Sequence, residues 1–389
     1  MPTPAELHQD GLALTPPMGW NSWNSFGGNL SQQAIFETAD AMVATGLKAA
    51  GYEYLVIDDV WHGCRGEDGF LQEDRKKFPD GMKAVADYVH SKGLKFGMYS
   101  DAGVKTCAGK PGSFNHEKQD AQQFAKWEID FLKFDYCYAP EDWQTAIELY
   151  TRMGRELRAT GRKIVFSVCE WGVRSPWLWA AQAGGHLWRA TFDVVNKWDA
   201  PQNCSKGIGI LTAIDGMSGL EKFAGPGGWN DPDMLTIGLK PNDNVGIGKT
   251  CNEHEQRTQF SMWCLLAAPL MIGCDIRNMS PVTSGILLNT EAIAVNQDPL
   301  GKQGVCVSRV GPMEVWKKPL TGDRFAVALL NRDEHEQPIA AAWADLELPE
   351  GQAMKVRDLW AHKDLGQFTD SFSTNVQPHE CVLLLMQTA

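Results

Sequence analysis

Between residues 15 and 300, short apolar runs alternate with longer stretches in which apolar residues recur at helical spacing. A strand followed by a helix and a second strand is the unit from which parallel sheets are built, and repeated units favour an α/β fold. We therefore expect a (β/α)8 TIM barrel, with strands at 53–57, 94–99, 131–135 and 163–168 and helices at 80–92, 117–127 and 141–160.

Each of these four apolar strands ends in polar or acidic residues. Barrel strands are packed on both faces, whereas their carboxyl ends open into the loops that hold active sites. Helix N-caps explain one or two such carboxylates, but not a series with Trp, Lys and Glu interleaved. The pattern predicts one shared pocket, formed by Asp58-Asp59, Ser100-Asp101, Asp135 and Cys169-Glu170.

The pattern changes after about residue 302, where short apolar runs are separated by turn residues. Such short strands without intervening helices are typical of a small antiparallel β-sandwich. Its strands are expected at 305–310, 314–317, 325–330 and 381–386. We place the boundary after Gly301, which gives a barrel domain at 1–301 and a C-terminal β-sandwich domain at 302–389.

Composition and charge narrow the class of protein. With 43% hydrophobic and 22% charged residues, the 389-residue chain is typical of a globular protein. A net charge of -12 repels phosphate backbones, so we expect no nucleic-acid partner. Apolar runs of about 18 residues are missing, so we expect no membrane span. The first ten residues lack the features of a signal peptide, which leaves a cytoplasmic protein and a mature exported form as alternatives.

Several kinds of chemistry are poorly supported. The ten Cys residues form no CxxC pair and no zinc-finger spacing, and the histidines form no HxH pair. A GxSxG motif is missing, and the Gly-rich segment 225–228 lacks the Lys-Ser/Thr of a phosphate-binding loop. We therefore expect neither a metal nor a cofactor. The cysteines fit disulfides or buried thiols, and the 15 Trp residues fit core positions or sugar stacking.

Lys133 and Asp135 form the most informative local pattern. On a strand, residues i and i+2 lie on one face, so both side chains are expected to face into the barrel. A neighbouring cation keeps a carboxylate ionised, and an ionised Asp135 is able to attack an anomeric carbon. A structural ion pair explains the same two residues. A retaining glycosidase needs a second carboxyl group, for which Asp193 is the candidate, although other Asp residues have comparable spacing.

A series of motifs runs through nearly the whole chain in a fixed order. They are Pro17-Met18-Gly19-Trp20-Asn21-Ser22-Trp23, Asp58-Asp59, Lys133-Phe134-Asp135, Cys169-Glu170-Trp171-Gly172, Gly225-Pro226-Gly227-Gly228-Trp229-Asn230-Asp231-Pro232-Asp233-Met234 and Asn296-Gln297-Asp298-Pro299-Leu300-Gly301. Each is weak alone, but the ordered series is highly specific. It resembles glycoside hydrolase family 27, which contains α-galactosidases and α-N-acetylgalactosaminidases.

The resemblance implies roles for individual residues. Asp135 matches the family nucleophile and Asp193 its acid/base. Cys107 and Cys137 match a pair that is disulfide-bonded in many members. Within the sugar-binding set, Asp58 and Asp59 match ligands of the 4- and 6-hydroxyls, and Arg189 matches a ligand of the 2-position. The whole set is Trp23, Asp58, Asp59, Tyr99, Lys133, Cys169, Glu170, Trp171, Arg189 and Asp233.

The resemblance also implies a substrate. The segment Cys169-Glu170-Trp171 matches members that act on galactose, and Glu170 is expected to fill the acetamide space and to accept the proton of the 2-hydroxyl. A retaining exo-glycosidase is therefore expected, which removes terminal α-D-galactosyl residues from a galactose-containing oligosaccharide or glycan by double displacement. The alternatives are α-N-acetylgalactosaminidase or β-L-arabinopyranosidase activity, and a non-catalytic carbohydrate-binding protein.

Two positions depart from the family pattern. Val60 stands where the family often has a Cys, so Cys64 lacks an expected disulfide partner, and Phe192 is bulkier than the residue expected before the acid/base. Because the family is often exported, a secreted or periplasmic mature form is favoured over a cytoplasmic one. A monomer and a homodimer both fit the sequence.

Overall fold

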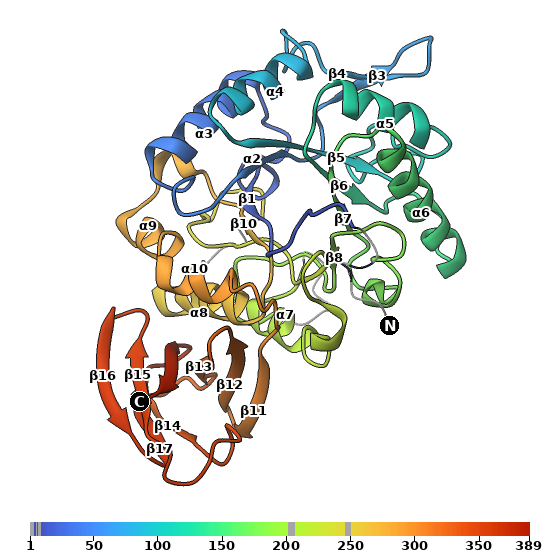
Figure 1. The fold of residues 1–389 in the computed structure, drawn as a ribbon. Helices are drawn as coiled ribbons and strands as arrows, with labels where there is room; N and C mark the ends of the chain where they lie inside the picture. The colour runs from blue at the N-terminus through green and yellow to red at the C-terminus, as the bar shows by residue number, and fades with distance from the viewer. Residues whose placement is uncertain (1–3, 5, 7–8, 201–206, 246–249) are drawn as a thin grey trace.

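The computed structural model describes residues 4, 6, 9–200, 207–245 and 250–389. Eight parallel strands form one curled sheet in the order β10-β1-β2-β5-β6-β7-β8-β9 (Figure 1). Their bounds are β1 Met18–Asn21, β2 Tyr54–Ile57, β5 Lys95–Asp101, β6 Phe131–Asp135, β7 Val165–Val168, β8 Leu187–Arg189, β9 Trp229–Asp231 and β10 Leu270–Ile272. The predicted strands lie at or within about two residues of the observed ones.

The barrel closes between β9 and β10 through a single residue. Leu235 forms a parallel bridge with Ile272, and its backbone N–H donates to the Met271 carbonyl oxygen at 2.8 Å. Strand β9 ends before this point because Pro232 has no N–H to donate and Asp233 has a φ of 89°, outside the extended region. The TIM-barrel prediction is confirmed, with a closure that rests on a short bridge.

Helices cover the outside of the barrel, as Figure 1 shows. The connection from β7 to β8 differs from the (β/α)8 expectation, because it contains turns and the 3-10 helix Pro176–Leu178 instead of an α-helix. This segment packs directly on α6, where a Cβ added at Gly154 would lie 2.1 Å from the Ala183 carbonyl oxygen. The helices are α2 Trp23–Phe26, α3 Gln32–Ala44, α4 Met82–Ser91, α5 Glu117–Lys126, α6 Trp143–Ala159, α7 Ile210–Gly216, α8 Glu253–Leu265, α9 Pro281–Leu287 and α10 Thr290–Asn296, with further 3-10 turns at Glu221–Phe223 and Ile276–Asn278 and a hairpin of β3 His62–Arg65 and β4 Leu71–Glu73.

Helix α6 illustrates how the sequence specifies these elements. Its N-cap residue Asp142 accepts a hydrogen bond from the Thr145 backbone N–H at 2.8 Å, which satisfies one of the free donors of the first turn. Leu149, Met153 and Leu157 recur at helical spacing and are buried against the barrel. Large aromatic side chains fill the same core, and the Trp side chains with 0% exposure are Trp20, Trp61, Trp188, Trp229 and Trp263.

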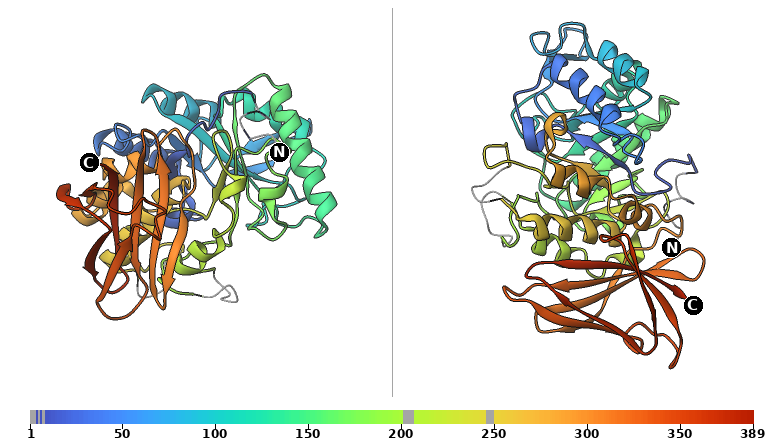
Figure 2. Two further views of the ribbon diagram at one scale, coloured as in Figure 1. Left: turned by 60° about the horizontal axis from the view of Figure 1, so that its bottom comes forward. Right: turned by 90° about the vertical axis from the view of Figure 1, so that its left-hand side faces the viewer.

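The C-terminal domain is a β-sandwich, as predicted (Figure 2). A six-stranded antiparallel sheet, in the order β11-β12-β13-β18-β15-β16, faces the two-stranded sheet of β14 and β17. Val327 and Leu384 on the larger sheet share a buried cluster with Ile339 and Phe372 on the smaller one. The strand bounds are β11 Val305–Val310, β12 Met313–Leu320, β13 Arg324–Asn331, β14 Gln337–Ala342, β15 Met354–Asp358, β16 Lys363–Phe368, β17 Ser371–Val376 and β18 Cys381–Thr388.

The two domains meet along α8, which lies against the C-terminal domain (Figure 1). Trp360 Nε1 donates to Ser261 Oγ at 2.9 Å, and Thr258 Oγ1 donates to the His379 carbonyl oxygen at 2.7 Å. The buried Lys318 Nζ donates to the Cys264 carbonyl oxygen, near the carboxyl end of α8, at 2.9 Å. The exact position of the domain boundary, after Gly301, stays a prediction.

We expect Lys318 to make stability depend on pH. Burial lowers the pKa of Lys318 from its usual 10.5 to about 7, so the folded protein releases this proton where the unfolded chain retains it. Stability contributed at this position therefore rises with pH between these two values, by at most about 1.4 kcal/mol per pH unit. Relative to Lys318→Met, the wild type should gain in melting temperature from about pH 6 to about pH 10. Parallel melting profiles of the two proteins would contradict this expectation.

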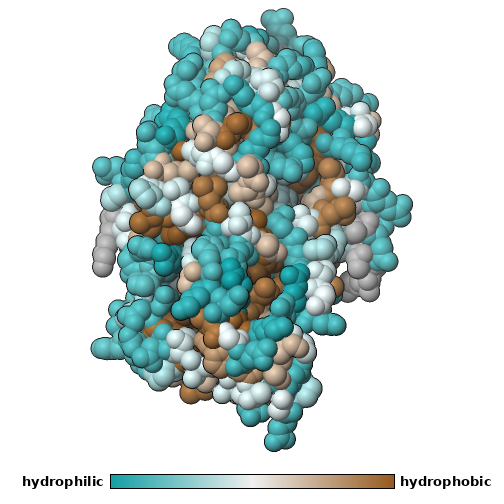
Figure 3. Space-filling model, turned by 60° about the vertical axis from the view of Figure 1, so that its left-hand side comes forward, coloured by the Kyte–Doolittle hydropathy of each residue, from teal (hydrophilic) through white to brown (hydrophobic). Residues whose placement is uncertain are grey.

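The surface is predominantly hydrophilic on the face drawn in Figure 3, with hydrophobic residues in scattered patches. Among the described residues, none of the helices has the length and apolar character needed to cross a bilayer. The sequence expectation of no membrane span agrees with this finding.

Candidate active site

A pocket opens at the carboxyl ends of the barrel strands, where the shared site was predicted. Seven of the eight strands contribute to it, through their carboxyl-terminal residues or the loops that follow them, so its residues are far apart in the sequence and close in space. Most of the predicted site residues line it, but Ser100, Asp101, Cys137, Cys169 and Glu170 do not. The lining consists of Trp23, Asn24, Asp58, Asp59, Tyr99, Cys107, Lys133, Asp135, Trp171, Arg189, Asp193, Val194, Asp233, Met234 and Val245.

Asp135 is the last residue of β6 and is 6% exposed. Its Oδ2 accepts a hydrogen bond from the Tyr99 hydroxyl at 2.9 Å, and its Oδ1 accepts the Tyr136 backbone N–H at 3.0 Å. Burial raises the pKa of Asp135 to about 6, and the positive charge of Lys133 opposes this effect. At neutral pH the carboxylate is therefore ionised, fixed in orientation and largely removed from water.

Lys133 forms its ion pair with Asp58. The alternative interpretation from the sequence, a structural ion pair between Lys133 and Asp135, is therefore wrong. Lys133 Nζ donates to Asp58 Oδ2 at 2.9 Å, and Asn21 Nδ2 donates to the same oxygen at 2.7 Å. The Asp58 side chain is held further by the Asp59 backbone N–H, which donates to Oδ1 at 2.8 Å. This corner of the pocket thus combines a fixed carboxylate with a cation.

Asp59 stands beside this corner with its own backbone donors. Its Oδ1 accepts the Val60 N–H at 2.6 Å, and its Oδ2 accepts the Ala108 N–H at 2.9 Å. Burial raises the pKa of Asp59 above its usual value, while these backbone donors oppose the shift. Two adjacent acceptors with fixed positions suit the recognition of neighbouring hydroxyl groups.

Arg189, at the end of β8, bridges two carboxylates. Its Nη2 lies 2.9 Å from Asp193 Oδ1, and its Nη1 lies 3.0 Å from Asp233 Oδ1. Asp233 is buried, and its Oδ2 accepts the Val194 backbone N–H at 2.7 Å. Desolvation raises the pKa of Asp193, but the cation of Arg189 outweighs it and holds the pKa below its usual value. The Asp193 side chain is 61% exposed, so it stands at the pocket mouth.

Glu170 is placed differently from its predicted role at the 2-hydroxyl. Its side chain is 0% exposed, and its Oε2 accepts the backbone N–H of Arg174 at 2.8 Å. Burial raises the pKa of Glu170 to about 7. Chain geometry explains the difference, because its neighbour Trp171 has a φ of 60° and lines the pocket while Glu170 is buried outside the lining. Cys169 is also buried, with its Sγ 3.7 Å from Arg189 Nη1.

Cys107 and Cys137 form a disulfide bond at the edge of the pocket, as the resemblance implied. Cys107 Sγ lies 3.5 Å from Asp135 Oδ2. The free cysteines are Cys64, Cys169, Cys251, Cys264, Cys274, Cys306 and Cys381, and Cys204 lies outside the described residues. The sequence left disulfides and buried thiols as alternatives for the cysteines, and both occur. Cys107 and Cys137 are bridged, and most of the other described cysteines are buried thiols.

Three further polar residues lie beside the site. Asp101 was predicted at the shared pocket, whereas Asn21 and Asp231 were not predicted as functional. Asn21 donates to Asp58, Asp101 Oδ2 accepts the Cys137 backbone N–H at 2.9 Å, and Asp231 Oδ1 accepts the Asp233 N–H at 2.8 Å. Each lies at the end of a barrel strand, in β1, β5 and β9. The strand-end rule that identified Asp135 also identified Asp101, and it applies to Asn21 and Asp231 once β1 and β9 are recognised as strands.

Two groups of side chains among the described residues have the composition of a metal site. In the first, Asp101, Cys107, Asp135 and Cys137 lie together, but the two sulfur atoms are bonded to each other. The second consists of Asp87, His90 and Glu128 at the surface. There Lys83 pairs with both Asp87 and Glu128, and His90 pairs with Asp130. Neither group is arranged as a free set of ligands.

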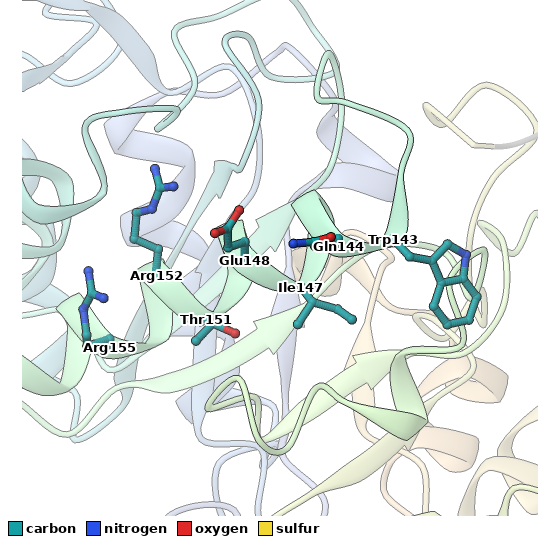
Figure 4. A pocket seen from close by; sticks show the side chains of 7 residues that line it. All are labelled: Trp143, Gln144, Ile147, Glu148, Thr151, Arg152 and Arg155. Carbon is teal, nitrogen blue, oxygen red and sulfur yellow. The ribbon is translucent and has the colours of Figure 1, made fainter.

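A second hollow lies on the outer side of α6, and all of its lining residues belong to that helix (Figure 4). Both of its arginines are paired with carboxylates: Arg152 Nη1 lies 3.1 Å from Glu117 Oε1, and Arg155 Nη2 lies 2.7 Å from Glu156 Oε1. The hollow lacks the opposed carboxylates of the barrel pocket, and its lining is Trp143, Gln144, Ile147, Glu148, Thr151, Arg152 and Arg155. The barrel pocket is therefore the candidate active site.

Comparisons with known proteins agree with this site. The family described as Alpha galactosidase A matches residues 15–298, and the Alpha galactosidase C-terminal beta sandwich domain matches residues 310–386. An alpha-galactosidase of Oryza sativa is 44% identical over 97% of this chain and 86% of its own length. Alpha-galactosidase I from Mortierella vinacea has 35% identity and a TM-score of 0.92, covering 98% of each chain. A GH27 β-L-arabinopyranosidase from Geobacillus stearothermophilus has 26% identity and a TM-score of 0.85, covering 97% of this chain and 98% of its own. The chain belongs to the alpha-galactosidase family, glycoside hydrolase family 27.

Proposed function

We propose that this protein is a retaining α-galactosidase that removes terminal, non-reducing α-D-galactosyl residues. The observation that carries the proposal is the convergence of Asp135 and Asp193 on one pocket, together with the fixed acceptors Asp58 and Asp59. Two carboxyl groups supply the nucleophile and the acid/base of a double displacement. The family membership and the 44% identity to an alpha-galactosidase support the choice of substrate.

In the first step, Asp135 Oδ attacks carbon 1 of the galactosyl unit, and the bond from carbon 1 to the glycosidic oxygen breaks. Asp193 gives its proton to that oxygen, so the aglycone leaves as an alcohol. The product is a β-linked galactosyl ester of Asp135. In the second step, Asp193 removes a proton from water and the water oxygen attacks carbon 1. The bond from carbon 1 to the Asp135 oxygen breaks, which restores the carboxylate, and α-galactose leaves with its original configuration.

The charges around the pocket suit Asp135 as a nucleophile, but they disfavour the protonated form of Asp193 that the first step requires. Asp135 is ionised at neutral pH, as a nucleophile must be. Asp193 is bonded to Arg189, which favours its ionised form. We propose that a sugar hydroxyl at the 2-position takes over the Arg189 Nη2 donor, and that Asp193 is then free to carry the catalytic proton.

Galactose recognition is assigned to the corner opposite the acid/base. Asp58 and Asp59 are proposed to accept hydrogen bonds from the 4- and 6-hydroxyls, with Lys133 as a donor beside them and Trp23 as an aromatic wall. An epimer with an equatorial 4-hydroxyl would leave buried charged acceptors without partners, which is costly. No metal or cofactor takes part in the proposed scheme.

The decisive experiment compares three nitrophenyl substrates, the α-galactoside, the α-N-acetylgalactosaminide and the β-L-arabinopyranoside. We expect kcat/KM for the α-galactoside to exceed the other two by about 100-fold or more, because a missing 6-hydroxyl leaves a buried carboxylate unpaired and an acetamide group has to displace packed side chains. Preference for either of the other substrates would overturn the assignment. Absence of all three activities would favour a carbohydrate-binding protein instead.

We also propose a cellular location, a natural substrate class and an oligomeric state. The disulfide at the pocket edge favours a secreted or periplasmic location, since such bonds persist in oxidising compartments. The substrate is proposed to be a galactose-containing oligosaccharide or glycan, and the protein is proposed to act as a monomer or homodimer. Gel filtration with light scattering on the purified protein tests the oligomeric part of this proposal.

A further inference from the structure

The loop after β7 contains a buried ion pair that the proposed reaction does not use. Glu170 Oε2 accepts the Arg174 backbone N–H at 2.8 Å and lies 3.4 Å from Arg174 Nη1. Glu170 Oε1 has no hydrogen-bond partner among the described residues, and both side chains are buried. A buried ion pair with incomplete hydrogen bonding adds little stability, which points to a role other than stabilisation.

Arg174 joins two loops of the active site. Its Nε and Nη2 donate to the Glu141 carbonyl oxygen at 3.0 and 2.9 Å, in the loop after β6. Its guanidinium lies 4.7 Å from the centre of the Tyr136 ring. Tyr136 directly follows Asp135 and donates its backbone N–H to that carboxylate. The Glu170–Arg174 pair therefore connects the loop after β7 to the segment that carries the proposed nucleophile.

Trp171 lies inside the turn that this pair closes, and it lines the sugar pocket. Its φ of 60° is in the left-handed region, which residues other than glycine retain only when their surroundings hold them there. The next residue, Gly172, has a φ of 78°, and a Cβ there would lie 2.3 Å from the Ala190 carbonyl oxygen. The turn is thus pressed against the adjacent loop, and Glu170 and Arg174 fix its two ends.

We propose that Glu170 and Arg174 are positioning residues, which hold Trp171 in place as a wall of the galactose pocket and thereby set the affinity for the sugar. This inference rests on the proposed α-galactosidase function. It replaces the predicted role of Glu170 as a ligand of the 2-hydroxyl with an indirect one, exerted through the position of Trp171.

Substitutions at the pair should affect binding more than chemistry. A pocket wall contacts the sugar in the ground state and in the transition state alike, so displacing it raises KM and leaves kcat nearly unchanged. We expect Glu170→Ala and Arg174→Met each to raise KM for nitrophenyl α-galactoside about tenfold, with kcat within about twofold of wild type. Glu170→Gln retains an oxygen acceptor for the Arg174 N–H, so its KM should stay within about threefold of wild type.

A 2-deoxygalactoside separates the positioning role from direct contact with the sugar. If Glu170 acts through Trp171, Glu170→Ala loses the same factor in kcat/KM on nitrophenyl α-galactoside and on its 2-deoxy analogue. A loss that disappears on the 2-deoxy analogue would show a direct bond to the 2-hydroxyl and overturn the inference. An unchanged KM in both Glu170→Ala and Arg174→Met would overturn it as well.

The matched control is Arg155→Met, on the outer side of α6 (Figure 4). Arg155 is exposed and pairs with Glu156 far from the pocket, so this Arg-to-Met change should leave KM and kcat at wild-type values. Activity of the wild type on the α-galactoside tests the proposed function separately. An inactive wild type would refute that function, whereas an active wild type with unaffected variants would refute the positioning role alone.

Discussion

Asp135→Ala is expected to lower kcat for α-galactosides by roughly 10⁵-fold while the protein stays folded. The reason is that Asp135 is the only carboxylate in the proposed scheme that bonds to carbon 1, and water held in its place is a far weaker nucleophile. The substitution also removes the acceptor of the Tyr99 hydroxyl, so melting temperature and circular dichroism should be recorded beside the kinetics. Steady-state hydrolysis of nitrophenyl α-galactoside measures the loss.

Azide makes the same variant a test of mechanism. In Asp135→Ala, azide should enter the space left by the carboxylate and attack carbon 1 of an activated aryl α-galactoside opposite the leaving group. One displacement inverts the configuration, so the expected product is β-galactosyl azide. The matched control is Asp345→Ala, which changes an exposed Asp of the C-terminal domain and should leave kcat unchanged. Hydrolysis by Asp135→Ala at a rate near that of wild type would refute the nucleophile assignment.

Asp193→Ala should lower kcat/KM by a factor that depends on the leaving group of the substrate. Sugar aglycones leave as poor, basic groups and need the proton of Asp193, so kcat/KM for them should fall about 10³-fold. A dinitrophenyl leaving group needs no proton, so formation of the galactosyl ester should be nearly normal with that substrate. The ester should then accumulate, because water lacks its general base. A burst of dinitrophenol followed by slow turnover is the expected record.

The azide product distinguishes the two carboxylates. Azide needs no general base, so it should speed turnover of the ester in Asp193→Ala and yield α-galactosyl azide after two inversions. The two variants are thus expected to give opposite anomers from one substrate, which nuclear magnetic resonance resolves directly. Detection of β-galactosyl azide from Asp193→Ala would be incompatible with a retaining enzyme.

Much of the fold was accessible from the sequence because its determinants are local. The spacing of apolar residues separates strands from helices within a short window, and predicted strands such as 131–135 coincide with the observed β6. The (β/α)8 expectation did not anticipate that β7 and β8 are joined without an α-helix. This connection depends on its packing against α6 at Gly154, which is a tertiary contact. The closure through Leu235 depends on one bridge that carries no pattern of its own.

Some features of the candidate site could likewise be predicted from the sequence, whereas others depend on the tertiary structure. The sequence by itself determined that carboxylates end the barrel strands and that Asp58, Asp135 and Asp193 belong to one family pattern. Only the tertiary structure decided that Lys133 pairs with Asp58, 75 residues away in the chain, and that Glu170 turns from the pocket toward Arg174. The physical reason is that alternation along a strand fixes the face on which a side chain lies. Its partner depends on which strands and loops become neighbours when the barrel closes.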